Sequence, residues 1–282
     1  MNRAMRVAYL GPAGTFTEDA LREATAGSED FEPLPAGTIY DAILAVERRE
    51  ADRALVPFEN SIEGAVRSTL DTLALEAEEV TIVGEFDYPI RVSLIARREL
   101  GLEEITAVLS HQQASAQCAR FLREQLPRAE VRATDSTAEA VRALSESDQP
   151  WAALGARAAA ALYDCVPLRD GIEDSGENVT RFVWIAPQGT EPRGEEPWKT
   201  SLVFSELGED HPGALVEALL EFSQREVNLT RIESRPLRQG LGRYMFFIDL
   251  EGSAEEPQVA DAIEGLRGKA ESVRLLGSYP TG

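Results

Sequence analysis

Cysteine, lysine and histidine are all rare in this chain, and each shortage narrows the functions open to it. The two cysteines, Cys118 and Cys165, are too few for a disulfide framework or a cysteine-rich zinc site. We therefore predict two buried thiols in a reducing compartment, which favours a cytoplasmic location, and no metal site. The only lysines are Lys199 and Lys269, so nearly all positive charge is carried by arginine.

Long apolar runs and a basic surface are missing as well. No stretch approaches the roughly 20 apolar residues of a membrane span, and the N-terminal sequence MNRAMRVAYLGPAG has too short an apolar run for a signal peptide. The 49 acidic residues outnumber the 28 basic ones, so the formal net charge is −21. We expect neither nucleic acid nor membrane as a partner, because both are bound through Lys and Arg. A small anionic substrate would need a cleft that concentrates arginines.

The first two thirds of the chain alternates short apolar strands with helices. A strand at Val7 to Leu10 ends in a Gly-Pro-Ala-Gly turn, and a helix follows from about Thr17. Comparable units follow at residues 54–57, 107–126 and 152–163. This alternation predicts an α/β sheet. The segment from Thr81 to Ile95 instead holds two β-rich stretches, as expected where a chain passes between two lobes and forms mixed sheets.

A change of composition near residue 187 predicts a domain boundary. The stretch PQGTEPRGEEPW combines prolines, glycines and glutamates without apolar periodicity, as a solvated linker does. We expect a two-lobed domain over residues 1–187, with chain crossings near 80–95 and 165–180, then a linker over 188–198 and a second domain over 199–282. The second domain has the pattern of a ferredoxin-like βαββαβ module, an α+β fold.

Four polar segments stand beside apolar strands, where ligands bind in open α/β folds. They are Gly11-Pro12-Ala13-Gly14-Thr15, Glu59-Asn60-Ser61, Ser110-His111-Gln112-Gln113 and Asn178-Val179-Thr180-Arg181. Glycine amides beside a helix start suit an anion, but the first segment matches neither the phosphate-loop nor the dinucleotide pattern. Each segment taken singly also allows a structural role, because Asn60, Ser61 and Ser110 are good helix caps and Thr180 suits a strand.

The combination of motifs resembles the prephenate dehydratase family. GPAGTFT, VPFENSIEG, SHQQASAQC, DSTAEAV and GENVTRF occur in the family's order and approximate spacing, over residues 6 to about 186. The C-terminal module resembles an ACT domain, an amino-acid-sensing ferredoxin-like fold. The resemblance implies a type II periplasmic-binding-protein-like catalytic domain with the active site in its cleft.

The resemblance also implies a reaction. Prephenate loses CO2 together with its ring hydroxyl and becomes aromatic phenylpyruvate, a step of L-phenylalanine biosynthesis that needs no redox change, metal or cofactor. Such a hydro-lyase must hold two carboxylates and help hydroxide to leave, and only interactions that strengthen in the transition state accelerate the step. A cation held on the ring carboxylate would stabilise the anion that has to leave, so neutral donors suit this position.

The family pattern assigns roles to residues of the four polar segments. We expect Thr180 to donate a hydrogen bond to the departing hydroxyl, and Arg181 to bind a carboxylate near the pyruvyl end unless it pairs with Glu59 or Asp174. The residues expected to act in catalysis are Thr180, Arg181, Asn60, Ser61 and Glu59. Those expected to bind the substrate are Gly11, Pro12, Gly14, Thr15, Ser110, His111, Gln113, Asn178 and Phe182.

Control by L-phenylalanine at the ACT domain is a further implication. The family binds the effector between paired subunits, so we expect a homodimer or a homotetramer. Gly213 at a helix start would leave room for an amino acid whose carboxylate meets free backbone amides. The expected phenylalanine-binding residues are Gly213, Ala214, Leu215, Glu233, Ser234, Arg235 and Pro236. A module that only dimerises is the alternative.

Two other functions remain open at this stage. Arogenate dehydratase carries out the same elimination on a substrate with an amino acid in place of the keto acid. A non-catalytic solute-sensing or amino-acid-sensing protein would share the two-lobed fold. Turnover of prephenate separates this last alternative from an enzyme. A fused chorismate mutase is not expected, because only a few residues precede Val7.

Overall fold

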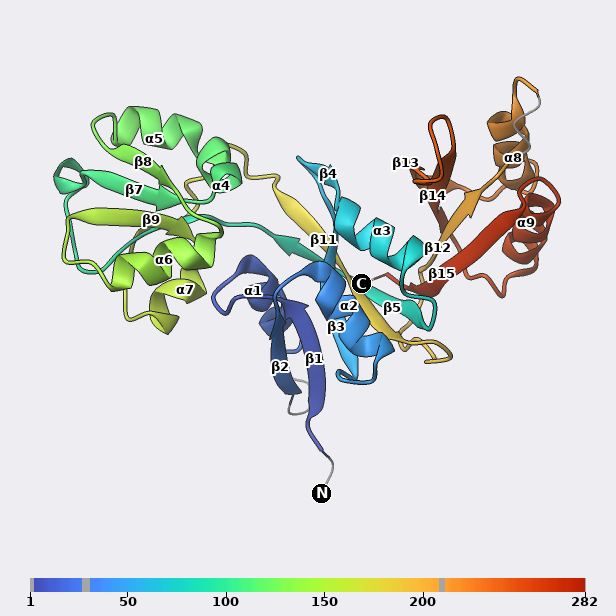
Figure 1. Ribbon diagram of the computed structural model, residues 1–282, viewed down its shortest axis with the longest axis horizontal. Coiled ribbons are helices and arrows are strands. Elements are labelled where there is room, and N and C mark those ends of the chain that lie inside the picture. The colour runs from blue at the N-terminus through green and yellow to red at the C-terminus, as the bar shows by residue number, and fades with distance from the viewer. Residues whose placement is uncertain (1–2, 27–30, 208–210, 282) are drawn as a thin grey trace. The chain divides into compact units, whose positions relative to one another are not determined.

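The computed structural model describes residues 3–26, 31–207 and 211–281, which form three β-sheets with their helices (Figure 1). By internal packing the chain divides into two compact units. The first consists of Met1–Ala42, Leu55–Gly64 and Asp87–Phe182, and the second of Ile43–Ala54, Ala65–Phe86 and Val183–Gly282.

The first sheet has the strand order β2-β1-β3-β11-β5, with the short β4 paired to β3. Its strands are β1 (Met5–Leu10), β2 (Phe31–Ala36), β3 (Arg53–Asn60), β4 (Gly64–Ala65), β5 (Val80–Pro89) and β11 (Val179–Pro187). Its helices are α1 (Phe16–Ala24), α2 (Ile39–Glu47) and α3 (Arg67–Leu75). β1 and β2 pair in parallel, and Val7, Ala8 and Tyr9 of β1 are buried, as the apolar run predicts.

The second sheet has the order β10-β6-β9-β7-β8 and is mixed. Its strands are β6 (Ser93–Ala96), β7 (Ala107–Ser110), β8 (Glu130–Ala133), β9 (Trp151–Gly155) and β10 (Val166–Arg169). Its helices are α4 (Gln112–Gln117), α5 (Ala119–Gln125), α6 (Thr137–Ser145) and α7 (Arg157–Leu162), with a 3-10 turn at Leu102–Glu104. β7 pairs in parallel with β8 and β9, whereas β6 is antiparallel to β9 and β10.

The chain passes from the first sheet to the second between β5 and β6, and returns between β10 and β11. The predicted α/β fold class, with two sheets and two chain crossings between them, is confirmed. The unit expected over 107–126 has two helices after its strand, α4 and α5. They break at Cys118, whose φ of −112° and ψ of 20° lie outside the helical range.

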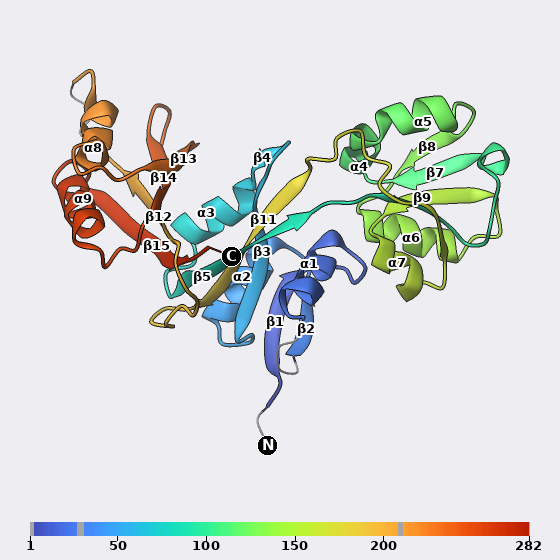
Figure 2. The same cartoon turned by 180° about the vertical axis from the view of Figure 1, so that it is seen from behind.

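The third sheet is antiparallel, with the order β13-β14-β12-β15 (Figures 1 and 2). Its elements are β12 (Trp198–Ser205), α8 (Ala214–Ser223), β13 (Leu229–Pro236), β14 (Tyr244–Glu251), α9 (Pro257–Arg267) and β15 (Ser272–Pro280). Leu202, Phe204 and Ile248 of the strands pack with Phe222 of α8 and Leu266 of α9 in one core. The predicted βαββαβ module is confirmed.

Residues 188–197 contain neither helix nor strand, since β11 ends at Pro187 and β12 begins at Trp198. The linker and the domain limits stay predictions.

Both cysteines are buried free thiols, as predicted, and burial raises the pKa of Cys118 to about 12. Within the described ranges, no helix is long and apolar enough to span a membrane, and no cluster of His, Cys, Asp and Glu could hold a metal ion.

Candidate active site

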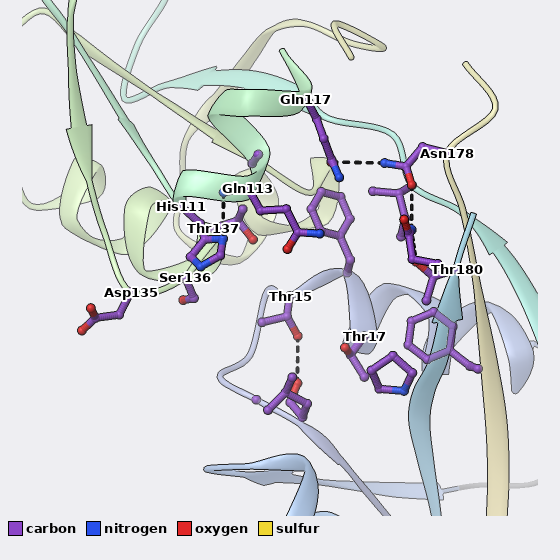
Figure 3. A pocket seen from close by; sticks show the side chains of 18 residues that line it. Thr15, Thr17, His111, Gln113, Gln117, Asp135, Ser136, Thr137, Asn178 and Thr180 are labelled. Atoms are coloured by element: carbon purple, nitrogen blue, oxygen red, sulfur yellow. Dashed lines mark hydrogen bonds between the residues drawn. The ribbon is translucent and has the colours of Figure 1, made fainter. Parts of the chain in front are cut away.

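A pocket of about 300 Å³ lies in the first compact unit, lined by side chains from both of its sheets (Figure 3). Its walls come from the C-terminal ends of β1 and β3, from the segments that follow β1, β5, β7 and β8, from the helices α1, α4 and α6, and from the start of β11. The carboxyl ends of strands carry ligand sites in open α/β folds. The predicted residues that line the pocket are Gly11, Thr15, Asn60, His111, Gln113, Asn178, Thr180 and Phe182.

Asn60, the last residue of β3, organises the polar side of this pocket. Its Oδ1 accepts hydrogen bonds from the backbone amides of Ile62 and Glu63, each at 3.0 Å. Backbone amides only donate, so the orientation of the Asn60 side chain is set and Nδ2 must be the atom on the other side. That Nδ2 donates to Asn178 Oδ1 at 2.7 Å and to Thr180 Oγ1 at 2.9 Å.

The same logic fixes Asn178 and brings in Gln117, which sequence reasoning did not single out. Asn178 Oδ1 accepts from Asn60, so its Nδ2 is the donor to Gln117 Oε1 at 3.2 Å. Gln117 on α4 thereby has its Nε2 left as a donor, and its side chain lines the pocket (Figure 3). The chain of hydrogen bonds thus links both sheets through neutral amides.

Thr180 ends this network with its hydroxyl oxygen as an acceptor. Only 7% of Thr180 is exposed, and Oγ1 takes its hydrogen bond from Asn60. In the part of the chain that the structure describes, no hydrogen bond from this hydroxyl to a protein acceptor is found. Because a hydroxyl has one proton to give, that proton is available to a ligand in the pocket.

Three helices begin at the pocket. Thr15 caps α1 through the amide of Glu18, His111 caps α4, and Ser136 caps α6 through the amide of Glu139. The amides of a first helical turn lack intrahelical acceptors, and the helix dipole places partial positive charge there. These helix starts favour anionic groups without placing a cation beside them.

The glycine loop contributes less than its sequence suggests. Gly11 lines the pocket, but its amide donates to the carbonyl of Ala36 at 3.0 Å. Gly14 donates to the buried carboxylate of Glu18 at 2.6 Å, and neither Gly14 nor Pro12 is among the residues that line the pocket. The amides of Gly11 and Gly14 are therefore engaged within the protein.

His111 lies at the pocket as a helix cap. Its Nδ1 accepts from the amide of Gln113 at 3.3 Å, so Nε2 carries the proton of the neutral ring and can donate. Ser110 is fully buried, donates to the carbonyl of His111 at 2.9 Å, and does not line the pocket. We infer a binding role for His111 and a structural one for Ser110.

Arg181, Glu59 and Ser61 are not among the residues that line the pocket. Successive side chains of a strand point to opposite faces, so Thr180 and Phe182 face the pocket while Arg181 faces away. Arg181 donates to Glu59 at 3.2 Å, and its guanidinium lies 4.7 Å from the centre of the Phe58 ring. This is the structural pairing with Glu59 that the sequence left open.

Ser61 joins two strands. Its hydroxyl donates to the carbonyl of Glu177 at 2.8 Å, and its Oγ accepts from the amide of Val179 at 3.0 Å. These bonds hold the end of β3 against the start of β11, where Asn60 and Thr180 meet. Ser61 therefore supports the geometry of the network from outside the pocket.

The pocket wall, as far as the structure describes it, contains no Lys or Arg, and its one carboxylate is that of exposed Asp135. The acidic composition led us to expect a cleft that concentrates arginines. The described wall of this pocket instead offers neutral hydrogen-bond donors and the N-terminal ends of helices. Burial raises the pKa of Tyr9 on β1 and of Tyr88 on β5 to about 12, so these phenols add no negative charge near neutral pH.

Comparison with known proteins decides the family. A family model described as prephenate dehydratase matches residues 7–190, and the ACT domain model matches residues 205–268. The chain belongs to the prephenate dehydratase family. The predicted enzyme class, a hydro-lyase, is confirmed with it, as is the ACT domain expected for its regulation.

Relatives of the prephenate dehydratase family match nearly the whole chain. The prephenate dehydratase of Mycobacterium marinum is 39% identical over 98% of this chain and 89% of its own length. The crystal structure of the Arthrobacter aurescens prephenate dehydratase in complex with L-Phe is 41% identical, with a TM-score of 0.89 over 98% of this chain and 90% of that one. GqqA, described as a quorum-quenching acylase, is 29% identical, with a TM-score of 0.87 over 98% of each chain.

Arg181→Met is predicted to lower the stability of the protein and to leave its pocket intact. The variant loses the Glu59 pair and the contact with Phe58, which should lower the free energy of unfolding by about 1–3 kcal/mol. KM for prephenate should change by less than about threefold, because Arg181 faces away from the pocket. Thermal unfolding and steady-state kinetics check both parts, with exposed Arg267→Met as the control. A KM raised more than about tenfold, with unchanged stability, would place Arg181 on the substrate.

Proposed function

We propose that the chain performs the prephenate dehydratase reaction in the pocket around Thr180, with that hydroxyl as the donor to the leaving group. The observation that carries this is the hydrogen-bond chain through Asn60. It makes Thr180 Oγ1 an acceptor from the protein and so leaves the hydroxyl proton for the substrate. A donor fixed before the substrate arrives needs no reorganisation during the reaction.

The elimination balances with one proton. The bond between the ring and its carboxylate breaks, CO2 leaves, and the electron pair enters the ring as the bond to the hydroxyl oxygen breaks. The departing hydroxide takes up one proton to form water, and the ring of phenylpyruvate becomes aromatic. The Thr180 hydroxyl stabilises the growing negative charge on that oxygen, and solvent restores any proton that Thr180 transfers.

We place the two carboxylates of prephenate on neutral donors. The donors on the wall are Gln113, Gln117, Thr17, His111 and Thr137, beside the starts of α1, α4 and α6, whereas the hydroxyl of Thr15 already donates to the carbonyl of Leu10. Such groups bind anions through partial charges, and they stabilise the ring carboxylate less than a guanidinium would. Its conversion into uncharged CO2 is therefore opposed less.

We also propose that L-phenylalanine binds the ACT domain and controls turnover. The Arthrobacter aurescens relative was crystallised with L-Phe. Here Gly213 is the N-cap of α8, and its φ of 100° is a backbone conformation that residues with a side chain rarely adopt. Gly213 is exposed to solvent. Ala214 and Leu215 follow in the first turn of α8 and are half-buried. This exposed helix start suits the carboxylate of an amino acid.

A pairing of subunits through the ACT domain fits the same surface. β13 is an edge strand of its sheet, and its Ile232 is 49% exposed. Val216 and Leu220 of α8 are 60% and 42% exposed. Exposed apolar residues beside an open strand edge are typical of an interface, so we propose a homodimer or homotetramer.

The buried free thiols of Cys118 and Cys165 support a reducing, cytoplasmic environment.

The test compares prephenate with arogenate as substrates of the purified protein. Release of phenylpyruvate or phenylalanine is followed with each, with and without added L-phenylalanine. We expect kcat/KM for prephenate to exceed that for arogenate by about tenfold or more. A preference for arogenate would move the assignment to arogenate dehydratase, and no turnover of either would favour a sensing protein. Acylase activity without any elimination would align the chain with GqqA instead.

A further inference from the structure

Asp71, in the middle of α3, is held by two arginines of the ACT domain inside the second compact unit. Arg235 Nε donates to Asp71 Oδ1 at 3.0 Å, and Arg235 Nη2 donates to Oδ2 at 2.7 Å. Arg238 Nη2 also donates to Oδ2. The side chains of Asp71 and Arg235 are only 12% and 15% exposed, so this bidentate pair is largely shielded from water.

A third arginine of the ACT domain holds the end of the same helix. Arg274 on β15 donates to the carbonyl of Leu73 at 2.7 Å and to the carbonyl of Ala77. These carbonyls lie at the C-terminal end of α3, where the helix dipole favours a cation. β13 and β15 are the two edge strands of the ACT sheet, so both edges contribute a contact to one helix.

α3 has few local features that would hold it in place by itself. Its N-cap, Val66, makes no side-chain hydrogen bond, its first turn has no acidic residue, and its last turn has no basic one. Caps and terminal charges normally stabilise helix ends. The placement of α3 therefore depends on outside contacts, and the three arginines are such contacts.

The two faces of β13 divide the segment predicted to bind phenylalanine. Ser234 pairs with Phe246, which packs on the core under α8 and α9, whereas Arg235 pairs with Met245 on the other face. Cross-strand partners share a face, so Ser234 lies on the helix side and Arg235 on the side of α3. One short strand thus contacts α3 with one face and leaves Ser234 and Pro236 exposed.

The other end of α3 leads to the candidate active site through the chain itself. Segment 61–66 links Asn60 to the first residue of α3, Arg67. The amides of Ile62 and Glu63 in this segment donate to Asn60 Oδ1, the atom that fixes the orientation of Asn60 toward Thr180. A displacement of α3 is transmitted to these donors by covalent bonds.

We propose that Asp71 is a positioning residue through which β13 controls α3, and that α3 in turn controls the Asn60–Thr180 hydrogen bond. Phenylalanine bound at β13 then alters turnover by changing the ion pairs that Arg235 and Arg238 form with Asp71. The proposal rests on the proposed function of the ACT domain as the phenylalanine site. It assigns the coupling between the two sites to a single carboxylate.

The test uses the full-length protein and Asp71→Asn, which keeps the size of the side chain and removes its charge. Arg238→Gln is a milder variant at a 63% exposed arginine, and Asp71→Glu retains the carboxylate. Glu264→Gln, which removes an exposed carboxylate paired with Arg267 on α9, is the matched control. Three quantities are measured: the phenylalanine Kd by calorimetry, the ratio of kcat/KM with and without phenylalanine, and amide hydrogen exchange over residues 61–75.

We expect phenylalanine to change kcat/KM of the wild type by about tenfold or more, as coupled sites commonly do. In Asp71→Asn the ratio should fall below about threefold, with Kd within about fivefold of the wild type and no exchange response over 61–75. The ratio for Arg238→Gln should lie between those of the wild type and Asp71→Asn. Asp71→Glu and Glu264→Gln should have the same ratio and the same exchange response as the wild type.

A wild-type ratio and exchange response in Asp71→Asn would overturn the proposal. Loss of phenylalanine binding in both Asp71→Asn and Arg238→Gln would also overturn it, because Asp71 would then serve the effector site itself. If phenylalanine changed neither kcat/KM of the wild type nor its amide exchange over 61–75, the proposed coupling would be refuted, and the proposed reaction would not be affected. Absent turnover with an intact exchange response would instead refute the reaction and support the coupling.

Discussion

Thr180→Val lowers kcat for prephenate by about 100- to 1,000-fold, as expected when one preorganised donor to a growing negative charge is removed. Valine keeps the shape and β-branching of threonine, so the buried position on β11 stays filled. KM should change by less than about threefold, because the hydrogen bond to the leaving oxygen strengthens only in the transition state. Steady-state kinetics of phenylpyruvate release measure both constants.

The control for this prediction is Thr180→Ser, which retains the hydroxyl and its hydrogen bond from Asn60. It should keep kcat within about tenfold of the wild type, since serine supplies the same donor with more rotational freedom. Equal losses in both variants would show that packing at Thr180 matters more than its proton. A valine variant with unchanged kcat would remove Thr180 from the mechanism.

Asn60→Asp should lower kcat by about 1,000-fold and reduce the free energy of unfolding by about 2–4 kcal/mol. The two side chains have nearly the same shape, but the carboxylate cannot donate to Asn178 Oδ1 or Thr180 Oγ1. The new carboxylate oxygen, which can only accept, would then face the oxygens Asn178 Oδ1 and Thr180 Oγ1. Residue 60 is only 9% exposed, so water cannot readily relieve this contact. The Thr180 proton would turn toward residue 60 and away from the substrate.

Kinetics and denaturant unfolding check the Asn60 prediction together. Asn228→Asp, in the exposed loop between α8 and β13, adds the same charge outside the pocket and should leave both quantities near the wild-type values. If Asn60→Asp lost stability but kept kcat, the network would hold the fold together without orienting Thr180.

The loops that carry the pocket could be predicted from the sequence because strand ends have a clear local signature. The apolar runs over 7–10, 54–57 and 107–110 lie in β1, β3 and β7. Parallel strands deliver such ends to one edge of a sheet. The family motifs add the start of β11, so the sequence predicts that Asn60, Asn178 and Thr180 lie in one site.

The direction of single side chains could not be predicted in the same way. Thr180 and Arg181 are adjacent, and a shift of one residue in strand register exchanges the face that each occupies. Only the pairing of β11 places Thr180 in the pocket and Arg181 beside Glu59. An arginine next to a catalytic candidate in an acidic protein was an attractive partner for an anion, and the strand geometry gives it a structural role.

Gln117 was missed although a helical signal for it exists. It follows Gln113 by four residues, and residues four apart share one face of a helix. Both line the pocket from α4. Asp71 had no comparable signal, because its partners Arg235 and Arg238 lie 164 and 167 residues farther along the chain. Contacts of that separation depend on tertiary packing.

The most direct test of the account follows both products of one reaction. Prephenate labelled at its ring carboxyl is incubated with the wild-type protein, and labelled CO2 and phenylpyruvate are measured over the same time course. The account predicts that the two appear together in equal amounts, and that Thr180→Val slows both by the same factor. Consumption of prephenate without labelled CO2, or equal rates for wild type and Thr180→Val, would contradict it.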